Sequence, residues 1–157
     1  MNHIRFTNTI CLYIKRDLTM PYDPLIVQPM REELTSAGFT ELRSPEDVDA
    51  AITSSGISLI VVNSVCGCAA GGARPGVKMS LDNTKKPDHL FTVFAGQDLE
   101  ATSKAREYFK GQPPSSPAIA LMKDGELIGF MPRHAIEGAS PDMISSALKK
   151  AYDEVCS

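Results

Sequence analysis

The stretch ISLIVVNSVCGC, residues 57–68, decides how the rest of the chain is interpreted. Its first seven residues, Ile57 to Asn63, are apolar or β-branched almost throughout, which is typical of a strand buried on both faces of an α/β sheet. Cys66 and Cys68, separated by one glycine, follow this strand directly. We therefore expect two thiols at the point where a central strand gives way to a helix.

Small residues alternating with larger apolar ones predict that helix over 66–81. It contains Pro75, and a proline collides with the carbonyl group four residues earlier, here that of Gly71. We therefore expect a bend near this position.

Further outward, hydrophobic spacing and capping residues predict an alternation of helices and strands. The expected helices cover 25–37, 44–54, 98–109 and 140–155, and the expected strands cover 39–42, 89–94, 118–122 and 127–131. Asp124-Gly125 predicts a tight antiparallel hairpin between the last two strands. This order fits an α/β fold in which a mixed sheet carries helices on both faces.

The first 19 residues have no periodicity that ties them to the rest, and Met20 is followed by the proline-containing segment Pro21–Pro24. We interpret residues 1–19 as an N-terminal extension, either disordered or an artefact of the start site. Residues 20–157 then form one domain of ordinary size.

Charge and hydropathy argue against several kinds of partner. The net charge is −3 and the sixteen basic residues are dispersed, so no basic cluster favours nucleic acid. No run of about eighteen apolar residues favours a membrane, and the N-terminus lacks the pattern of a secretory signal. We expect a cytoplasmic protein.

The Cys66-Gly67-Cys68 motif predicts redox chemistry. A cysteine at the first turn of a helix is exposed to free N–H groups and to the positive end of the helix dipole, which favour the thiolate. Cys66 is then the nucleophile, and Cys68 is placed to attack a mixed disulfide formed on Cys66. Buried free cysteines that only fill space are one alternative. A zinc or copper module is another, although zinc prefers four ligands and no second Cys/His pair is present, so we predict no metal.

A disulfide between these two cysteines would close a ring of about eleven atoms, three fewer than in a CxxC motif. Such a tight ring should be strained and easily reduced. We therefore predict that this pair is less reducing than the dithiol of thioredoxin, whose reduction potential is about −270 mV.

A second feature is the Ser116-Pro117 bond, which precedes a strand and follows a Pro-Pro-Ser-Ser loop. It is a candidate cis peptide bond.

From about Met20 onward the chain resembles the bacilliredoxin family of thioredoxin-like proteins with a CGC active site. The residues that carry the resemblance are 29–31, 33–35, 37–39, 61–71, 73–75, 93–98, 106–109, 114–117 and 132–134. The resemblance implies a thioredoxin-like fold, Cys66 as the attacking thiol, Cys68 as the resolving thiol and Pro117 as a cis-proline facing them. Gly67 and the backbone of Ser116 would contact the substrate.

The resemblance also implies the activity: disulfide isomerisation, or reduction of mixed disulfides between protein cysteines and a low-molecular-weight thiol such as bacillithiol. The partners would be such mixed disulfides, misfolded disulfide-bonded proteins and the small thiol as co-substrate, with no bound cofactor. Residues 1–19, including Cys11, lie outside the resemblance.

Four further residues are candidates for the site. Arg74, Arg133 and His134 would stabilise a thiolate or bind an anionic small thiol, or they are ordinary surface charges. Cys156 is either an exposed bystander or a second resolving thiol on a mobile tail.

Overall fold

The structure, a computed structural model, describes residues 21–157; the predicted extension over 1–19, with Cys11, lies outside this part. Its framework is a five-stranded mixed sheet in the order β1-β3-β2-β4-β5. The strands are β1 (Thr40–Glu41), β2 (Ile57–Asn63), β3 (His89–Phe94), β4 (Ala118–Lys123) and β5 (Glu126–Met131). β3 is parallel to β1 and β2, whereas β4 is antiparallel to β2 and β5. The predicted mixed sheet is confirmed.

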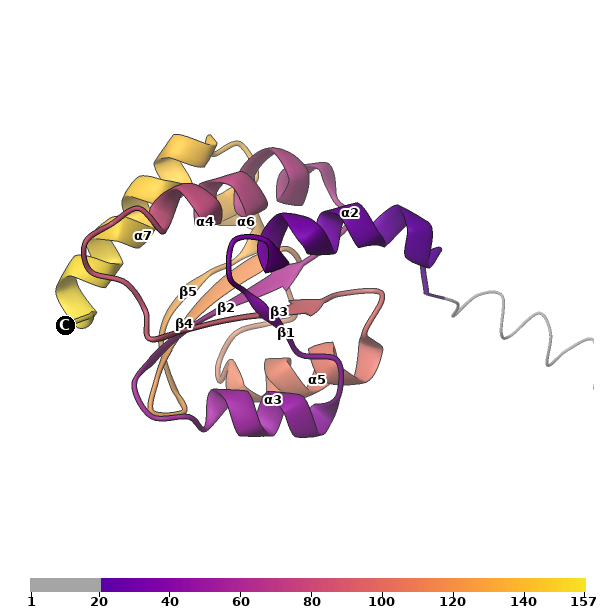
Figure 1. The fold of residues 1–157 in the computed structure, drawn as a ribbon, viewed down its shortest axis with the longest axis horizontal. Coiled ribbons are helices and arrows are strands. Elements are labelled where there is room, and N and C mark those ends of the chain that lie inside the picture. The colour runs from indigo at the N-terminus through magenta and orange to yellow at the C-terminus, as the bar shows by residue number, and fades with distance from the viewer. Residues whose placement is uncertain (1–20) are drawn as a thin grey trace, which may run out of the picture.

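Helices cover both faces of this sheet (Figure 1). One face carries α2 (Pro24–Thr35), α4 (Arg74–Ser80) and α7 (Pro141–Val155), and the other carries α3 (Pro45–Ile52) and α5 (Leu99–Tyr108). Successive side chains of β2 serve the two cores in turn, since Leu59 and Val61 pack with the first layer and Ile60 and Val62 with the second. The prediction that this strand is central and buried on both faces is therefore confirmed.

Local sequence signals explain where several elements begin and turn. Ser44 and Asp47 form a capping box at the start of α3, with Pro45 in the first turn. Asp124 and Gly125 both have positive φ, 48° and 84°, which is typical of the tight hairpin predicted between β4 and β5. The chain also contains a short helix that the sequence did not predict, α6 (Arg133–Ile136).

The helix that follows the cysteines is irregular where a bend was expected. A π-helical turn, η1 (Ala69–Ala73), lies there and leads directly into α4. The backbone N–H of Arg74 donates to the carbonyl of Ala69, five residues earlier. Pro75 lies in the first turn of α4, where its missing N–H group is tolerated. A wide turn thus takes the place of the predicted bend in a regular α-helix, and such turns occur often at functional sites.

The contact between α4 and α7 depends on Gly76. A Cβ atom at this position would lie 2.8 Å from Ile144 Cβ and 3.1 Å from the Pro141 carbonyl oxygen. We expect Gly76→Ala to destabilise the fold by about 1–3 kcal/mol, because helix α7 must move, although alanine favours helix formation. Gly71→Ala is the matched control, since nothing lies within 4 Å of its Cβ position. Urea unfolding midpoints measure the difference, and equal midpoints would contradict the close packing.

Within residues 21–157, the structure contains no helix that is both long enough and apolar enough to cross a membrane.

Candidate active site

Three segments that are distant in sequence meet at the edge of the sheet where β2 ends. In the antiparallel pairs Val62 lies opposite Ala118, and Ile119 lies opposite Met131. The start of β4 is therefore beside the end of β2, and the end of β5 is beside the start of β4. This register brings the Cys66 turn, the Ser116-Pro117 bond and the first residues of α6 to one edge.

Cys66 occupies the first turn of the helix that leaves β2. Its carbonyl oxygen accepts hydrogen bonds from the N–H groups of Ala69 and Ala70, at 3.0 and 3.2 Å. Its own N–H donates to Ser64 Oγ at 3.2 Å. Both cysteines are partly exposed, and Gly67 between them is exposed with no atom near its Cβ position. The thiols are thus held by a fixed backbone and open to a substrate.

The two thiols have opposite ionisation tendencies. The pKa of Cys66 is lowered, first by a hydrogen bond from the Cys68 thiol, then by the Cys68 backbone N–H and the charge of Arg133. The pKa of Cys68 is raised by burial and by its hydrogen bond to the Cys66 thiolate. Cys66 is therefore the thiol that ionises first, and Cys68 keeps its proton to higher pH, as the position of Cys66 in the sequence predicts.

This pairing predicts how Cys66 responds to pH. Alkylation follows the thiolate fraction, so a lowered pKa moves the rise in rate to lower pH. We expect Cys68→Ala to shift the profile of Cys66 to higher pH, because the thiol donor is lost. Cys68→Ser is the control, since its hydroxyl still donates, and its profile should stay closer to that of the wild type. Identical profiles for the two variants, measured with iodoacetamide, would contradict the role of Cys68 as donor.

The Ser116-Pro117 peptide bond is cis, as predicted. Pro117 is buried and Ser116 is half-buried. The neighbouring Ser115 Oγ accepts a hydrogen bond of 2.7 Å from the backbone N–H of Arg133. The proline loop and the start of α6 are therefore joined directly.

Arg133 and His134 are exposed on α6. Arg133 Nε donates to Glu137 Oε1 at 2.7 Å. This hydrogen bond, followed by the negative charge of the Cys66 thiolate, raises the pKa of Arg133. Of the two residues, Arg133 thus has an electrostatic connection to the dithiol. The sequence marks Arg133 as a candidate, but it does not show the connection to the dithiol, because that connection depends on strand register.

Arg74 differs from its interpretation as a surface charge, which is wrong: the residue is 1% exposed. Its Nε donates to Glu33 Oε2 at 2.9 Å, and its Nη1 donates to Asn63 Oδ1 at 3.0 Å and to the Ser64 carbonyl at 2.9 Å. Arg74 therefore ties α2 and α4 to the segment that leads into Cys66.

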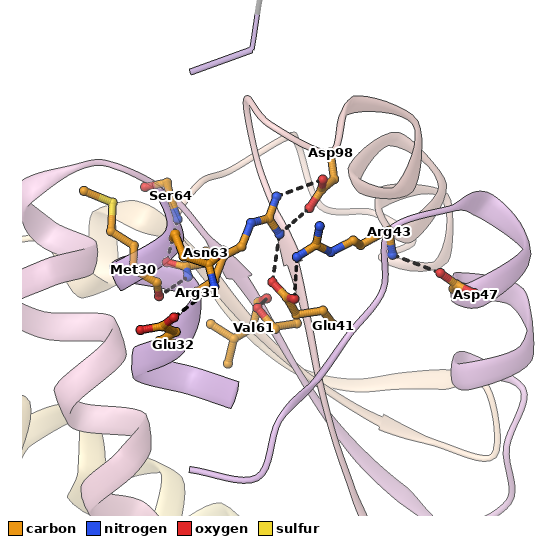
Figure 2. Close-up of polar contacts among 12 residues, drawn as sticks. Met30, Arg31, Glu32, Glu41, Arg43, Asp47, Val61, Asn63, Ser64 and Asp98 are labelled. Atoms are coloured by element: carbon orange, nitrogen blue, oxygen red, sulfur yellow. Dashed lines mark hydrogen bonds and ion pairs between the residues drawn. The ribbon is translucent and has the colours of Figure 1, made fainter. Parts of the chain in front are cut away.

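Asn63 is the centre of this connection. Its Oδ1 accepts from the Ser64 N–H at 2.9 Å, and its Nδ2 donates to the Met30 carbonyl at 3.1 Å. Figure 2 shows these contacts beside a second anchor of α2, in which Arg31 contacts Asp98 and Glu41. Helix α2 is thus fixed to the ends of β1 and β2 and to the start of α5.

Cys156 lies away from Cys66 and Cys68, near the opposite end of β2. It is 6% exposed within the core under α7, so its interpretation as an exposed bystander is wrong. Burial raises its pKa, and the charges that act on it belong to Asp88, Lys85 and Asp153. Asp88 accepts a hydrogen bond from the N–H of Ile57, the first residue of β2, whereas Cys66 follows the last. This placement gives no support to Cys156 as a second resolving thiol.

The described residues contain no group of three or more His, Cys, Asp or Glu side chains that is suited to hold a metal ion. The site therefore offers no observation in favour of the metal-binding alternative.

A thioredoxin-like arrangement is found in the solved structures that the chain resembles. Oxidised mitochondrial thioredoxin 3 from Saccharomyces cerevisiae has a TM-score of 0.52 and 21% identity, covering 78% of this chain and 99% of that one. Oxidised thioredoxin from Plasmodium falciparum has a TM-score of 0.53 and 16% identity, covering 73% and 99%. The protein thus belongs by its fold to the thioredoxin-like class, and it carries a dithiol at the start of a helix.

Sequence comparison narrows this class to a family. A family profile described as "Disulphide isomerase" matches residues 22–156. A bacilliredoxin of Cytophaga hutchinsonii is 60% identical over 134 residues, covering 85% of this chain and 99% of that protein. One of Geobacillus kaustophilus is 55% identical over 131 residues, covering 83% and 90%. The chain belongs to the bacilliredoxin family, which confirms the resemblance seen in the sequence.

Proposed function

We propose that this protein reduces mixed disulfides between protein cysteines and a low-molecular-weight thiol such as bacillithiol. The observation that carries the proposal is that the two thiols differ in acidity, with a lowered pKa at partly exposed Cys66 and a raised pKa at Cys68. An attacking thiolate and a protonated reserve thiol are the two groups that this reaction requires. The name that these relatives share, bacilliredoxin, supports a redox function.

The reaction proceeds by two exchanges. The Cys66 thiolate attacks the sulfur of the small thiol, a bond forms between these two sulfurs, and the protein thiolate leaves and takes up a proton. Cys68 then loses its proton and attacks the Cys66 sulfur, which forms the Cys66–Cys68 disulfide and releases the small thiolate. The substrate is reduced by two electrons and the dithiol is oxidised by two. Two small thiols, which become joined as their own disulfide, or one dithiol protein, which becomes oxidised, would return these two electrons.

Disulfide isomerisation is the second candidate, and the description of the matching family profile as "Disulphide isomerase" favours it. It requires only the first exchange, because a Cys66 mixed disulfide can be resolved by a thiol of the substrate itself.

In either reaction exposed Gly67 and the backbone of Ser116 beside the cis bond would contact the substrate. An exposed dithiol that must stay reduced fits a cytoplasmic location.

The test uses the full chain in reduced form. One substrate is a protein with a single cysteine joined to bacillithiol, and the other is a protein with scrambled disulfides. We expect release of bacillithiol together with a two-proton mass loss on the enzyme, as Cys66 and Cys68 become joined. A mixed disulfide that persists, while the scrambled protein is rearranged, would favour isomerisation over reduction. No reaction with either substrate would overturn the proposal.

A further inference from the structure

A hollow of about 410 Å³ lies beside the edge of the sheet where β2 ends and the two cysteines follow. It is formed between the loop that leads into β4 and the segment that follows β5. Its volume is in the range of small-molecule sites. The loop side contributes Pro113, Pro114, Ser115 and Ser116, and the opposite side contributes Pro132, Arg133, His134 and Glu137. The hollow thus combines rigid apolar walls with a few polar groups.

We propose that this hollow binds a carboxylate of a small anionic thiol while the sulfur of that thiol is exchanged at Cys66, with Arg133 as the partner of the carboxylate. The inference rests on the proposed function and names the kind of small thiol that it uses.

The position and the exposure of Arg133 suit it to bind a carboxylate. Its backbone is fixed by the hydrogen bond of 2.7 Å to Ser115 Oγ, whereas its guanidinium is about half exposed. The only ion-pair partner of that guanidinium in the described part of the chain is Glu137, itself half exposed. Exposed ion pairs contribute little stability, so a ligand carboxylate replaces Glu137 at small cost. A guanidinium binds a carboxylate through two parallel hydrogen bonds.

The same residue connects the hollow to the reacting sulfur. The charge of Arg133 acts on Cys66 and Cys68, and the Cys66 thiolate acts on Arg133 in return. Strand register places the end of β5, next to Arg133, beside the start of β4, next to the cis bond. A small molecule bound at Arg133 therefore has its carboxylate in the hollow and its sulfur within reach of Cys66. Because the chain carries a net charge of −3, a local cation is needed to attract an anion.

Charge selectivity tests this inference. Three small disulfides of different charge are the probes: oxidised glutathione (anionic), hydroxyethyl disulfide (neutral) and cystamine (cationic). Second-order rates with the full chain are measured across pH, so that changes in the Cys66 thiolate fraction are separated from changes in recognition. We expect Arg133→Gln to lower the ratio of anionic to neutral rates by roughly three- to tenfold. Arg133→Lys should retain part of the ratio, and Glu137→Gln should raise it.

Arg43→Gln is the matched control, because Arg43 is a comparably exposed arginine paired with a glutamate and lies outside the hollow. It should leave the ratio unchanged. An equal fall in all three rates in Arg133→Gln would mean that Arg133 acts only through the thiolate, and it would overturn the inference. So would a ratio that does not change.

Three further outcomes are informative. A cysteine peptide with acidic neighbours, joined to a neutral thiol, tests whether the carboxylate comes from the protein side. If the loss in Arg133→Gln follows the peptide's charge instead of the small thiol's charge, the inference is wrong. A wild-type protein that reacts with none of the three disulfides would overturn the proposed function itself. Normal reaction without charge selectivity would overturn only the hollow's role.

Discussion

Replacing Cys66 with serine is expected to lower the rate of disulfide exchange by at least about 1,000-fold, because a serine hydroxyl does not ionise near neutral pH and the thiolate is the nucleophile. The exposed position of Cys66 at the start of the helix and its lowered pKa make it the attacking group. The measurement is the rate at which a protein–bacillithiol mixed disulfide is reduced, followed by intact mass.

Two other cysteine variants serve as controls for this result. Cys68→Ser should complete the first exchange and accumulate a mixed disulfide on Cys66, because the resolving thiol is missing. Cys156→Ala, assayed where it is folded, should keep the wild-type rate, since Cys156 is buried at the other end of β2. Substantial exchange by Cys66→Ser, or adduct on Cys68 in the wild type, would contradict the assigned roles.

Replacing Arg74 with alanine is expected to destabilise the fold by about 2–4 kcal/mol, because it removes a buried guanidinium that pairs with half-exposed Glu33 and leaves buried acceptors without their donor. Glu33 would lose its guanidinium, and Asn63 Oδ1 and the Ser64 carbonyl would lose a buried donor. The change in the free energy of unfolding is obtained from urea denaturation with a constant m-value.

Arg43→Ala is the matched control for Arg74→Ala. The side chain of Arg43 is 54% exposed in its ion pair with Glu41, so its loss should cost no more than about 1 kcal/mol. Glu33→Gln is a milder variant that should fold even if Arg74→Ala does not, and it should be less destabilising than Arg74→Ala. If Arg74→Ala and Arg43→Ala had the same free energy of unfolding, the buried contacts of Arg74 would not contribute to stability, and the prediction would be wrong.

Much of the fold was predictable because the strands carry local signals. The segments 57–63 and 89–94 match β2 and β3 residue for residue, since runs of apolar and β-branched side chains are interpretable without tertiary information. Helix α6 was not predictable in the same way, because four residues are too few to show a periodic pattern. The π-helical turn replaced a predicted bend because proline has more than one way to avoid the carbonyl behind it.

The residues of the candidate site likewise differ in how far local sequence reveals them. Cys66 and Cys68 were identifiable because the strand, the helix start and the thiols are contiguous in sequence. The ion pair of Arg74 with Glu33 joins residues 41 positions apart, and nothing in their local sequence marks them as partners. The burial of Cys156 also depends on how α7 packs, which its position near the C-terminus did not reveal.

Because Cys156 is buried, its thiol reports local unfolding of the end of α7. The backbone N–H of Cys156 donates to the Tyr152 carbonyl at 2.8 Å, so the sulfur is held at the end of α7 against the core. A thiol reagent reaches it only in molecules in which this part of α7 has detached, and its slow labelling therefore measures an opening equilibrium. The exposed dithiol reacts without any such opening. One chain thus carries a fast thiol pair that reports chemistry and a slow thiol that reports the integrity of the fold.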